Sequence, residues 1–266
     1  MVLVVFSICA MRAGRRALSG AALASAVLLR AFPVVLLLGV AVKSLWQWHR
    51  EGLTAAVRAY VRFAIGFLAT AAVLIGITTV TWAAAWGSPA GAWQGFAANT
   101  RKHMSGAMTN SLGLEPALSF RPSTRAAEIE GLWLDGPWDT WIAAHAETFE
   151  ERKPIYWAIA AGFLALFVAA VRKADDDEAI VLGLAILPVL LTLANYYYSL
   201  LLAFAFFWRR DAKIGVALVA LAALTALLPA ALSMRDDRYF VTSVALLVFS
   251  AFVLASRALS SSSVSV

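Results

Sequence analysis

The chain has 266 residues, of which 62% are apolar and only 14% are charged, and its formal net charge is +6. Water-soluble domains are roughly 45–50% apolar and about 25% charged, so this composition excludes an ordinary soluble globule. The basic residues are scattered at the ends of apolar segments instead of being clustered, which argues against a nucleic-acid partner. Because Cys9 is the only cysteine, an intramolecular disulfide and a cysteine-rich metal site are also excluded.

The N-terminal third contains two short apolar segments and then a long one. Residues 1–11 are apolar, but the positive charge follows them, so we expect the end of a membrane helix that starts before residue 1 and not a signal peptide. Residues 17–30 and 33–46 are each too short to cross a bilayer, and basic residues flank both outer ends. We predict a hairpin of two half-length helices with Arg30 near its apex, broken at Pro33.

Longer runs without Asp, Glu, Lys or Arg follow. A helix needs about 20 apolar residues to cross the hydrocarbon core, and the runs lack the polar alternation of a barrel strand. We therefore predict an all-α fold, a polytopic transmembrane helix bundle with half-length helical hairpins and one long outer loop. The uncharged runs are residues 63–86, 154–171, 179–208, 214–234 and 239–256.

Residues 87–153 form the predicted long loop. This segment is rich in tryptophan and carboxylates and contains two of the three histidines. Within it, residues 138–151 have the pattern of an amphipathic helix, which we expect to lie on the membrane surface. Its apolar positions are Trp138, Trp141, Ile142, Ala146 and Phe149.

The C-terminal part contains a second predicted hairpin. The run 179–208 is too long for a plain span, and Pro188 and the polar stretch 195–198 interrupt it, so its tip is expected at the outer interface. The acidic run 175–178 is expected to be a solvated turn. We divide the chain into N-terminal membrane helices (1–86), the outer loop (87–153), C-terminal membrane helices (154–257) and a serine-rich disordered tail (258–266).

The distribution of positive charge predicts the orientation. Lys and Arg are frequent in the turns at 12–16, 43–62, 172–173 and 209–213, whereas the short turn 235–238 holds only Arg235 and Arg238. By the positive-inside rule the first set is cytoplasmic, and the loop 87–153 is on the outer face.

No motif of a soluble enzyme is present, so ionisable and amide groups at membrane depth are the candidate site residues. Arg30 at a hairpin tip could bind a phosphate bidentately, or it could be a helix-end arginine that snorkels to the surface. In the polar segment 96–114, Asn99, His103 and Asn110 could form an outer-face pocket for a phosphorylated or sugar-bearing head group. The alternative is a basic loop that contacts lipid phosphates.

Two further clusters have competing interpretations. Asn195 and Tyr197, with the neighbouring tyrosines, could line a carbohydrate or prenyl-chain site, but an interfacial aromatic belt explains the tyrosines equally well. Asp236 and Asp237 could bind a metal or act as a base, yet the flanking Arg235 and Arg238 favour an ion-paired turn. No metal ligand and no catalytic residue is assigned.

Residues 12–33, RAGRRALSGAALASAVLLRAFP, resemble a recurring segment of the GT-C class of membrane glycosyltransferases, with Arg30 where lysine is more usual. The long loop and residues 194–198 also look like later parts of such proteins. The resemblance implies a polyprenyl-phosphate sugar donor as partner, besides membrane lipid, and a bacterial-type inner membrane as location. Arg30 and the segment 99–110 would hold the donor phosphate or the acceptor. A divalent cation is a candidate cofactor.

One departure from that class matters. Its catalytic carboxylate lies in the first outer loop, for which this chain has no counterpart. The chain therefore resembles the C-terminal portion of such an enzyme, and we expect that portion to be inactive alone. The alternatives are a transporter or permease subunit, whose substrate site would use broken helices, and a non-catalytic structural membrane protein.

Overall fold

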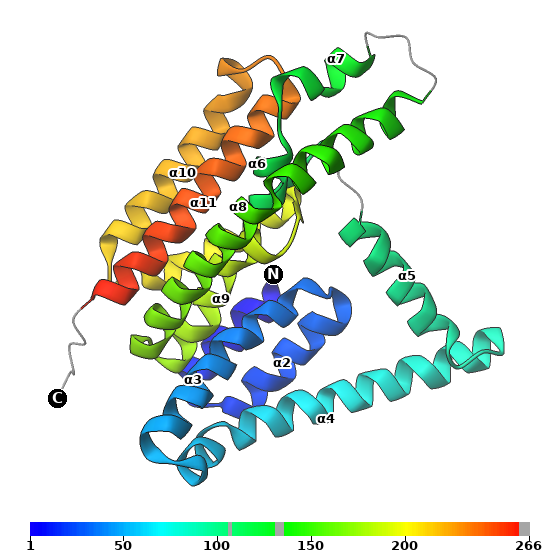
Figure 1. The fold of residues 1–266 in the computed structure, drawn as a ribbon. Coiled ribbons are helices and arrows are strands. Elements are labelled where there is room, and N and C mark those ends of the chain that lie inside the picture. The colour runs from blue at the N-terminus through cyan, green and yellow to red at the C-terminus, as the bar shows by residue number, and fades with distance from the viewer. Residues whose placement is uncertain (106–107, 131–135, 261–266) are drawn as a thin grey trace. The chain divides into compact units, whose positions relative to one another are not determined.

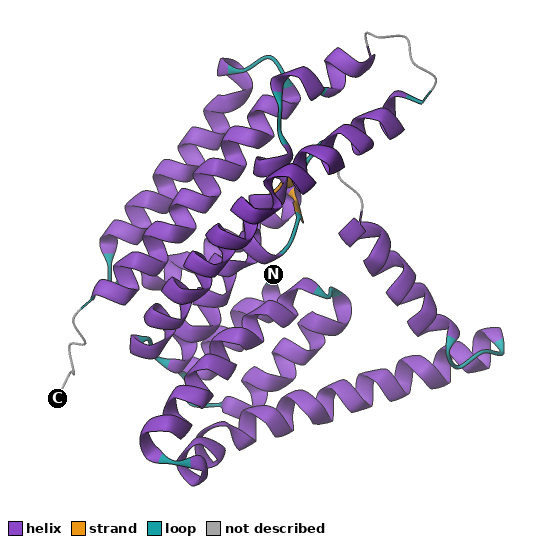
Figure 2. Cartoon of the chain, in the orientation of Figure 1, coloured by secondary structure: helices purple, strands orange, loops and turns teal. Residues whose placement is uncertain are grey.

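The computed structural model describes residues 1–105, 108–130 and 136–260. These residues are almost entirely helical, apart from one pair of two-residue strands (Figure 2). Four helices are long and apolar enough to cross a membrane. The predicted fold class is therefore confirmed: the chain is an all-α, multi-pass membrane protein.

The chain forms two compact units, which we describe separately. Unit 1 comprises residues 1–105 and 174–183, and unit 2 comprises residues 106–173 and 184–266. The elements of unit 1 are α1 (Val2–Arg12), α2 (Arg16–Leu29), η1 (Phe32–Leu36), α3 (Leu37–Glu51), α4 (Leu53–Trp86) and α5 (Gly91–Ser105). Helix α9 (Asp176–Leu190) is divided between the units.

Unit 2 begins with short elements and ends with long helices. They are β1 (Ser111–Leu112), α6 (Leu114–Ser119), η2 (Pro122–Thr124), α7 (Ala126–Glu130), α8 (Pro137–Lys173), β2 (Leu193–Ala194), η3 (Asn195–Phe207), α10 (Ala212–Ala231) and α11 (Arg235–Leu259). Helices α8, α10 and α11 run side by side (Figure 1).

In unit 1, α2 and α4 approach each other at two glycines. A Cβ atom added to Gly20 would overlap the carbonyl oxygen of Phe63, and one added to Gly66 would overlap that of Ala17. Small residues let membrane helices approach to backbone contact, which increases their van der Waals packing. Glycine at these two positions is thus a requirement of the helix crossing.

The break predicted between the two short segments is confirmed. Helix α2 ends at Leu29, Arg30 has extended backbone angles, and the 3₁₀ turn η1 leads into α3. Pro33 occupies the start of η1, where its missing N–H costs no helical hydrogen bond. The depth of Arg30 in the membrane stays a prediction.

The acidic run 175–178 is not the solvated turn that we predicted. Asp177 and Glu178 are buried in the first turn of α9. Asp176 accepts hydrogen bonds from Arg16 Nη2 at 2.7 Å and from the Tyr60 hydroxyl at 2.7 Å. Carboxylates are favourable at a helix N-terminus, and these two partners anchor the start of α9 within unit 1.

Residues 138–151 do not form a separate surface helix. They are the first part of α8, which continues through Pro154 to Lys173. Proline removes one backbone hydrogen bond but can be accommodated inside a membrane helix. The buried side chains of this part, Trp141, His145 and Thr148, lie on the face of α8 that packs against α6, so that face is covered by protein.

The second predicted break is also confirmed, because α9 ends at Leu190 and β2 follows. In the antiparallel ladder, Ser111 pairs with Ala194 and Leu112 with Leu193. Gly113 then starts α6 with φ +133°, where a Cβ atom would lie 2.6 Å from the carbonyl oxygen of Pro188. Its N–H donates to Ser243 Oγ of α11 at 3.2 Å. Only glycine fits this junction.

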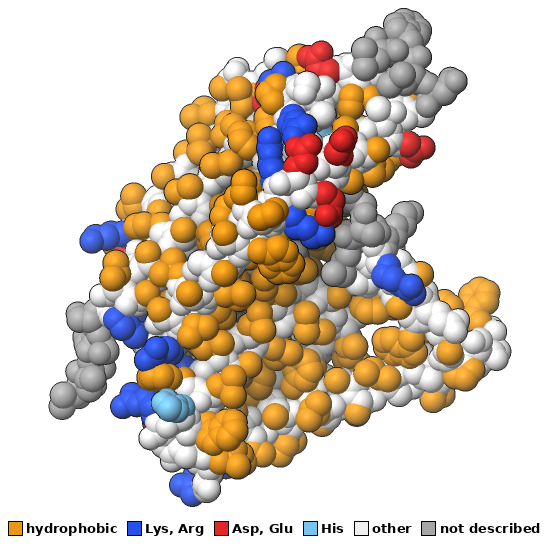
Figure 3. Space-filling view, viewed as in Figure 1, with side chains coloured by type: hydrophobic (Ala, Val, Ile, Leu, Met, Phe, Trp, Pro, Cys, Tyr) orange, Lys and Arg blue, Asp and Glu red, His pale blue; other side chains and the backbone are white. Residues whose placement is uncertain are grey.

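Helix α11 extends to Leu259, so residues 258–259 of the predicted tail are helical. Residues 261–266 lie outside the described residues. On the face drawn in Figure 3, hydrophobic side chains cover the sides of the long helices, and charged side chains gather toward their ends. This pattern suits helices whose flanks contact lipid.

Candidate functional site

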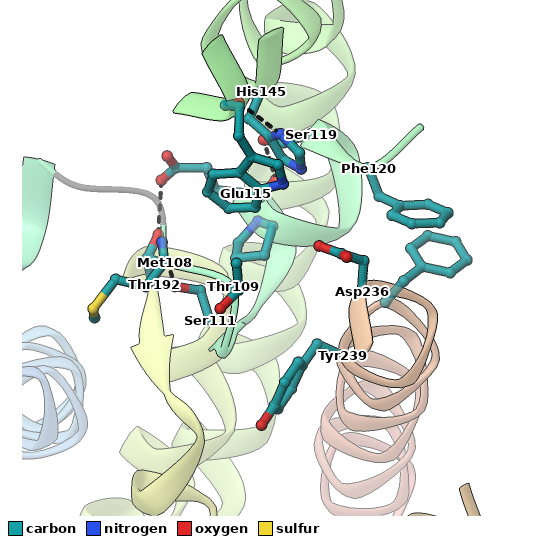
Figure 4. Close-up of a pocket in the computed structure, with 13 residues that line it drawn as sticks. Met108, Thr109, Ser111, Glu115, Ser119, Phe120, His145, Thr192, Asp236 and Tyr239 are labelled. Carbon is teal, nitrogen blue, oxygen red and sulfur yellow. Dashed lines mark hydrogen bonds between the residues drawn. The ribbon is translucent and has the colours of Figure 1, made fainter. Parts of the chain in front are cut away.

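Unit 2 contains a small, open pocket, which we call the polar pocket. Side chains of Glu115 from α6, His145 from α8 and Asp236 from α11 converge on it (Figure 4). Its lining residues are Met108, Thr109, Ser111, Glu115, Pro116, Ser119, Phe120, Trp141, His145, Thr192, Asp236, Tyr239 and Phe240.

The wall nearest the strand ladder is held by Glu115. Its Oε2 atom accepts a hydrogen bond of 2.8 Å from the hydroxyl of Thr192, the residue before β2. Gly113 turns the chain sharply from β1 into α6 and so brings Glu115 next to the second strand. One carboxylate oxygen is engaged in this contact, and the group keeps further capacity to accept hydrogen bonds.

Helix α8 supplies the closely packed rings of Trp141 and His145. The ring centroids of Trp141 and His145 are 3.9 Å apart, and Trp138 stacks on Trp141 at 5.1 Å. Trp141 is 4% exposed, and its Nε1–H has no hydrogen-bond partner among the described residues. Leaving such a donor unsatisfied costs about 1–3 kcal/mol, so its presence calls for a specific explanation.

The first turn of α11 holds the acidic pair that the sequence assigned to an ion-paired turn with Arg235 and Arg238. The partner of Asp237 is instead Arg125, whose Nε and Nη2 donate to its two oxygens at 2.8 and 3.0 Å. This hydrogen bonding raises the pKa of Arg125. Arg238 donates to the carbonyl oxygens of residues 232 and 233. Arg235 and Arg238 are near the aspartates in sequence, whereas the partner of Asp237 comes from a distant segment.

Asp236 has a different environment from its neighbour. It is 8% exposed, lines the polar pocket, and accepts one hydrogen bond of 3.1 Å from the backbone N–H of Ala126 at the start of α7. The bidentate pair next to it fixes the first turn of α11. Asp236 is thereby held at the pocket, with one carboxylate oxygen hydrogen-bonded to the protein.

A second, small cavity lies beside the same strands, and we call it the apolar groove. Its lining residues are Leu112, Leu184, Leu187, Pro188, Leu193, Tyr197, Tyr198, Leu200, Leu201 and Leu246. Successive side chains of a strand point to opposite faces. Accordingly Ser111 lines the polar pocket and Leu112 the apolar groove, so the ladder is a wall between them.

Two of the residues predicted for the site are brought together. The Asn110 side chain donates to Asn195 Oδ1 at 3.3 Å, and the Asn195 backbone N–H donates to the Asn110 carbonyl oxygen at 3.0 Å. Asn195 Nδ2 in turn donates to the Tyr239 hydroxyl at 3.1 Å. This chain of groups, the amide cluster, links the end of the ladder to the polar pocket. Tyr197, also predicted, lines the apolar groove.

The other predicted residues belong to unit 1. Arg30 is exposed after α2, and Asn99 is exposed on α5. His103 is in α5, but its side chain lies outside the described residues. A cavity shared by Arg30, His103 and Asn110 therefore stays a prediction.

Sequence reasoning missed the polar pocket as such. It treated Trp141 as part of a surface helix and the aspartates as a turn, and it gave no role to Glu115 or His145. The sequence marks these residues only weakly. Glu115 follows Gly113 by two positions, and Trp141 and His145 are four residues apart on one helix face. Among the described residues, no group of three or more His, Cys, Asp or Glu could hold a metal ion.

Comparison with protein-family models, with curated proteins and with solved structures gave no match for this chain.

Proposed function

We propose that unit 2 binds a lipid-linked sugar, with the head group at the amide cluster and the hydrocarbon chain in the apolar groove. The protein would then act in glycosyl transfer from a polyprenyl-phosphate carrier at the outer face of a bacterial-type inner membrane. The observation that carries the proposal is the position of the amide cluster, which reaches the polar pocket at Tyr239 and lies at the end of the two-stranded ladder, whose Leu112 and Leu193 line the apolar groove.

An amphiphilic ligand fits this arrangement for a physical reason. Binding pockets are mostly apolar and fix their ligand with a few directed polar groups. The groove offers leucine side chains and two tyrosines to a prenyl chain, and the exposed Asn195 offers an amide to the head group. The resemblance of residues 12–33 to GT-C glycosyltransferases supports the same ligand class. Arg30, Asn99 and His103 stay separate proposals for phosphate contacts, made from the sequence alone and confined to unit 1.

The groove can be tested by filling it. Leu246 is 2% exposed and lines the groove, whereas Val248 on the same helix is 64% exposed. We expect Leu246→Trp to weaken binding of a fluorescent polyprenyl-phosphate hexose by about tenfold or more, equivalent to about 1.4 kcal/mol. Binding would be measured with the whole chain in lipid nanodiscs.

Val248→Trp is the matched control, since it adds the same side chain to the lipid-facing side of α11, and it should bind within about twofold of the wild type. Equal affinity for wild type and Leu246→Trp would refute the groove as the chain site. No saturable binding by the wild type would refute the proposed function itself.

A further inference from the structure

The polar pocket carries hydrogen-bonding groups that the fold does not use. Trp141 Nε1–H is the clearest of them, because it is buried at the pocket and has no partner among the described residues. Tryptophan N–H groups usually find a partner when buried. An acceptor atom on a bound molecule would supply one.

His145, next to this donor, offers a hydrogen-bond acceptor. Its Nδ1 atom is 3.0 Å from the carbonyl oxygen of Trp141. Because a carbonyl can only accept, Nδ1 carries the hydrogen, and Nε2 of the neutral ring is an acceptor. The histidine is 7% exposed and lines the pocket.

The carboxylates add further acceptors. Asp236 and Glu115 each use one oxygen for the protein, toward Ala126 N and Thr192 Oγ1 respectively. Tyr239 accepts from Asn195, so its own hydroxyl hydrogen can be donated. The described residues that line the pocket include no Lys or Arg.

We propose that the polar pocket binds an uncharged polyhydroxyl group, such as a pyranose ring. Hydroxyl groups donate and accept at once, so they can satisfy the carboxylates, the His145 acceptor and the Trp141 donor together. The apolar side chains of the lining, which include the stacked pair Phe120 and Phe240, give the apolar surface that such a ring also needs.

Two other ligand classes fit less well. A phosphate would meet two carboxylates and no cationic side chain from the described lining residues, which is repulsive. A quaternary ammonium would suit the carboxylates and aromatic rings but has no acceptor for the Trp141 N–H. The donor and the acceptors together therefore favour hydroxyl groups.

Under the proposed function, on which this assignment rests, the polyhydroxyl group is the sugar acceptor and the lipid-linked donor lies across the ladder. Binding of a polyol to the pocket can be measured without any lipid-linked donor. The two ideas can therefore fail separately.

The test uses the indole signals of the ¹⁵N-labelled chain in nanodiscs, with Trp141→Phe to assign the Trp141 signal. The ligands are the methyl α-pyranosides of glucose, galactose and mannose, myo-inositol, glucose 1-phosphate and tetramethylammonium. We expect at least one uncharged polyol to shift the Trp141 signal saturably, and glucose 1-phosphate and tetramethylammonium to leave it unchanged. No shift with any polyol, or an equal shift with either charged ligand, overturns the proposal.

Two variants sharpen the result. Asp236→Asn and His145→Phe should each weaken polyol binding by about tenfold. Their controls are Glu147→Gln on the exposed side of α8 and His49→Phe on α3, which should change it by less than about twofold. If the controls weaken binding as much as the pocket variants, the site is elsewhere. Groove variants such as Leu246→Trp should leave polyol binding intact, whether or not they bind lipid.

Discussion

Two polar clusters, one in each unit, differ in how far their groups satisfy one another. In unit 1, Arg16, Tyr60 and Asp176 satisfy one another, with Arg16 also donating to the carbonyl oxygen of Ala59 at 2.6 Å. In unit 2, Trp141 and Asp236 line an opening and keep unused hydrogen-bonding capacity. A polar cluster whose groups are mutually satisfied is a structural feature, whereas one with unused capacity at a cavity is a binding feature.

The largest effect on stability is expected at the crossing of α2 and α4 in unit 1, where the backbones leave no space for a side chain. Gly66→Val on α4 would force side-chain atoms into the backbone of α2, and we expect it to lower the free energy of unfolding by about 3 kcal/mol. A Cβ atom added to Gly76 on the same helix meets no atom within 4 Å. Gly76→Val should therefore change the free energy of unfolding by less than about 0.5 kcal/mol. Unfolding would be followed in detergent; equal losses for both variants would mean that the helix crossing is not glycine-dependent.

A smaller effect is expected in the satisfied cluster. Asp176→Ala leaves a guanidinium and a phenol without their acceptor and should cost about 2 kcal/mol of unfolding free energy. Tyr60→Phe removes one of those bonds and should cost about 1 kcal/mol. The exposed Glu51 is the control, and Glu51→Ala should cost less than about 0.5 kcal/mol. A cost for Asp176→Ala no greater than that of the control would remove the contrast between the units.

The smallest effect on stability is expected at the polar pocket. Tyr239→Phe removes the hydroxyl that accepts a hydrogen bond from Asn195. Because Asn195 is exposed, its amide can bond to water instead, so the free energy of unfolding should change by less than about 0.5 kcal/mol. Polyol binding, by the indole signal of Trp141, should nevertheless weaken about threefold. Tyr196→Phe, an exposed neighbour, should alter neither quantity. A large loss of stability with unchanged binding would place Tyr239 with the structural groups.

The sequence predicted the parts of the fold that depend on local composition. Apolar runs gave the long helices, and Pro33 and the polar residues after Pro188 marked the two breaks. It failed at Pro154, because α8 continues through this residue, which usually ends a helix. It also failed at the acidic run 175–178, since Arg16 and Tyr60, which hold Asp176, come from distant segments.

The site was predictable only in part for the same reason. Asn110 and Asn195 were recognised singly as unusual polar groups near apolar segments, and the structure joins them. Glu115, His145 and Asp236 come from three helices and share no spacing, so no periodicity marks them as a set. Trp141 could not be distinguished from any interfacial tryptophan until its neighbours were known.

The ladder of β1 and β2 has a consequence for how the two cavities communicate. Ser111 and Leu112 are adjacent in the chain yet face different cavities, so any displacement of β1 changes both. If occupancy of the groove alters the affinity of the pocket by some factor, thermodynamic reciprocity requires the pocket to alter the groove by the same factor. Gly113, fixed between Pro188 and Ser243, limits how far the strand can move and so limits the size of that cooperativity.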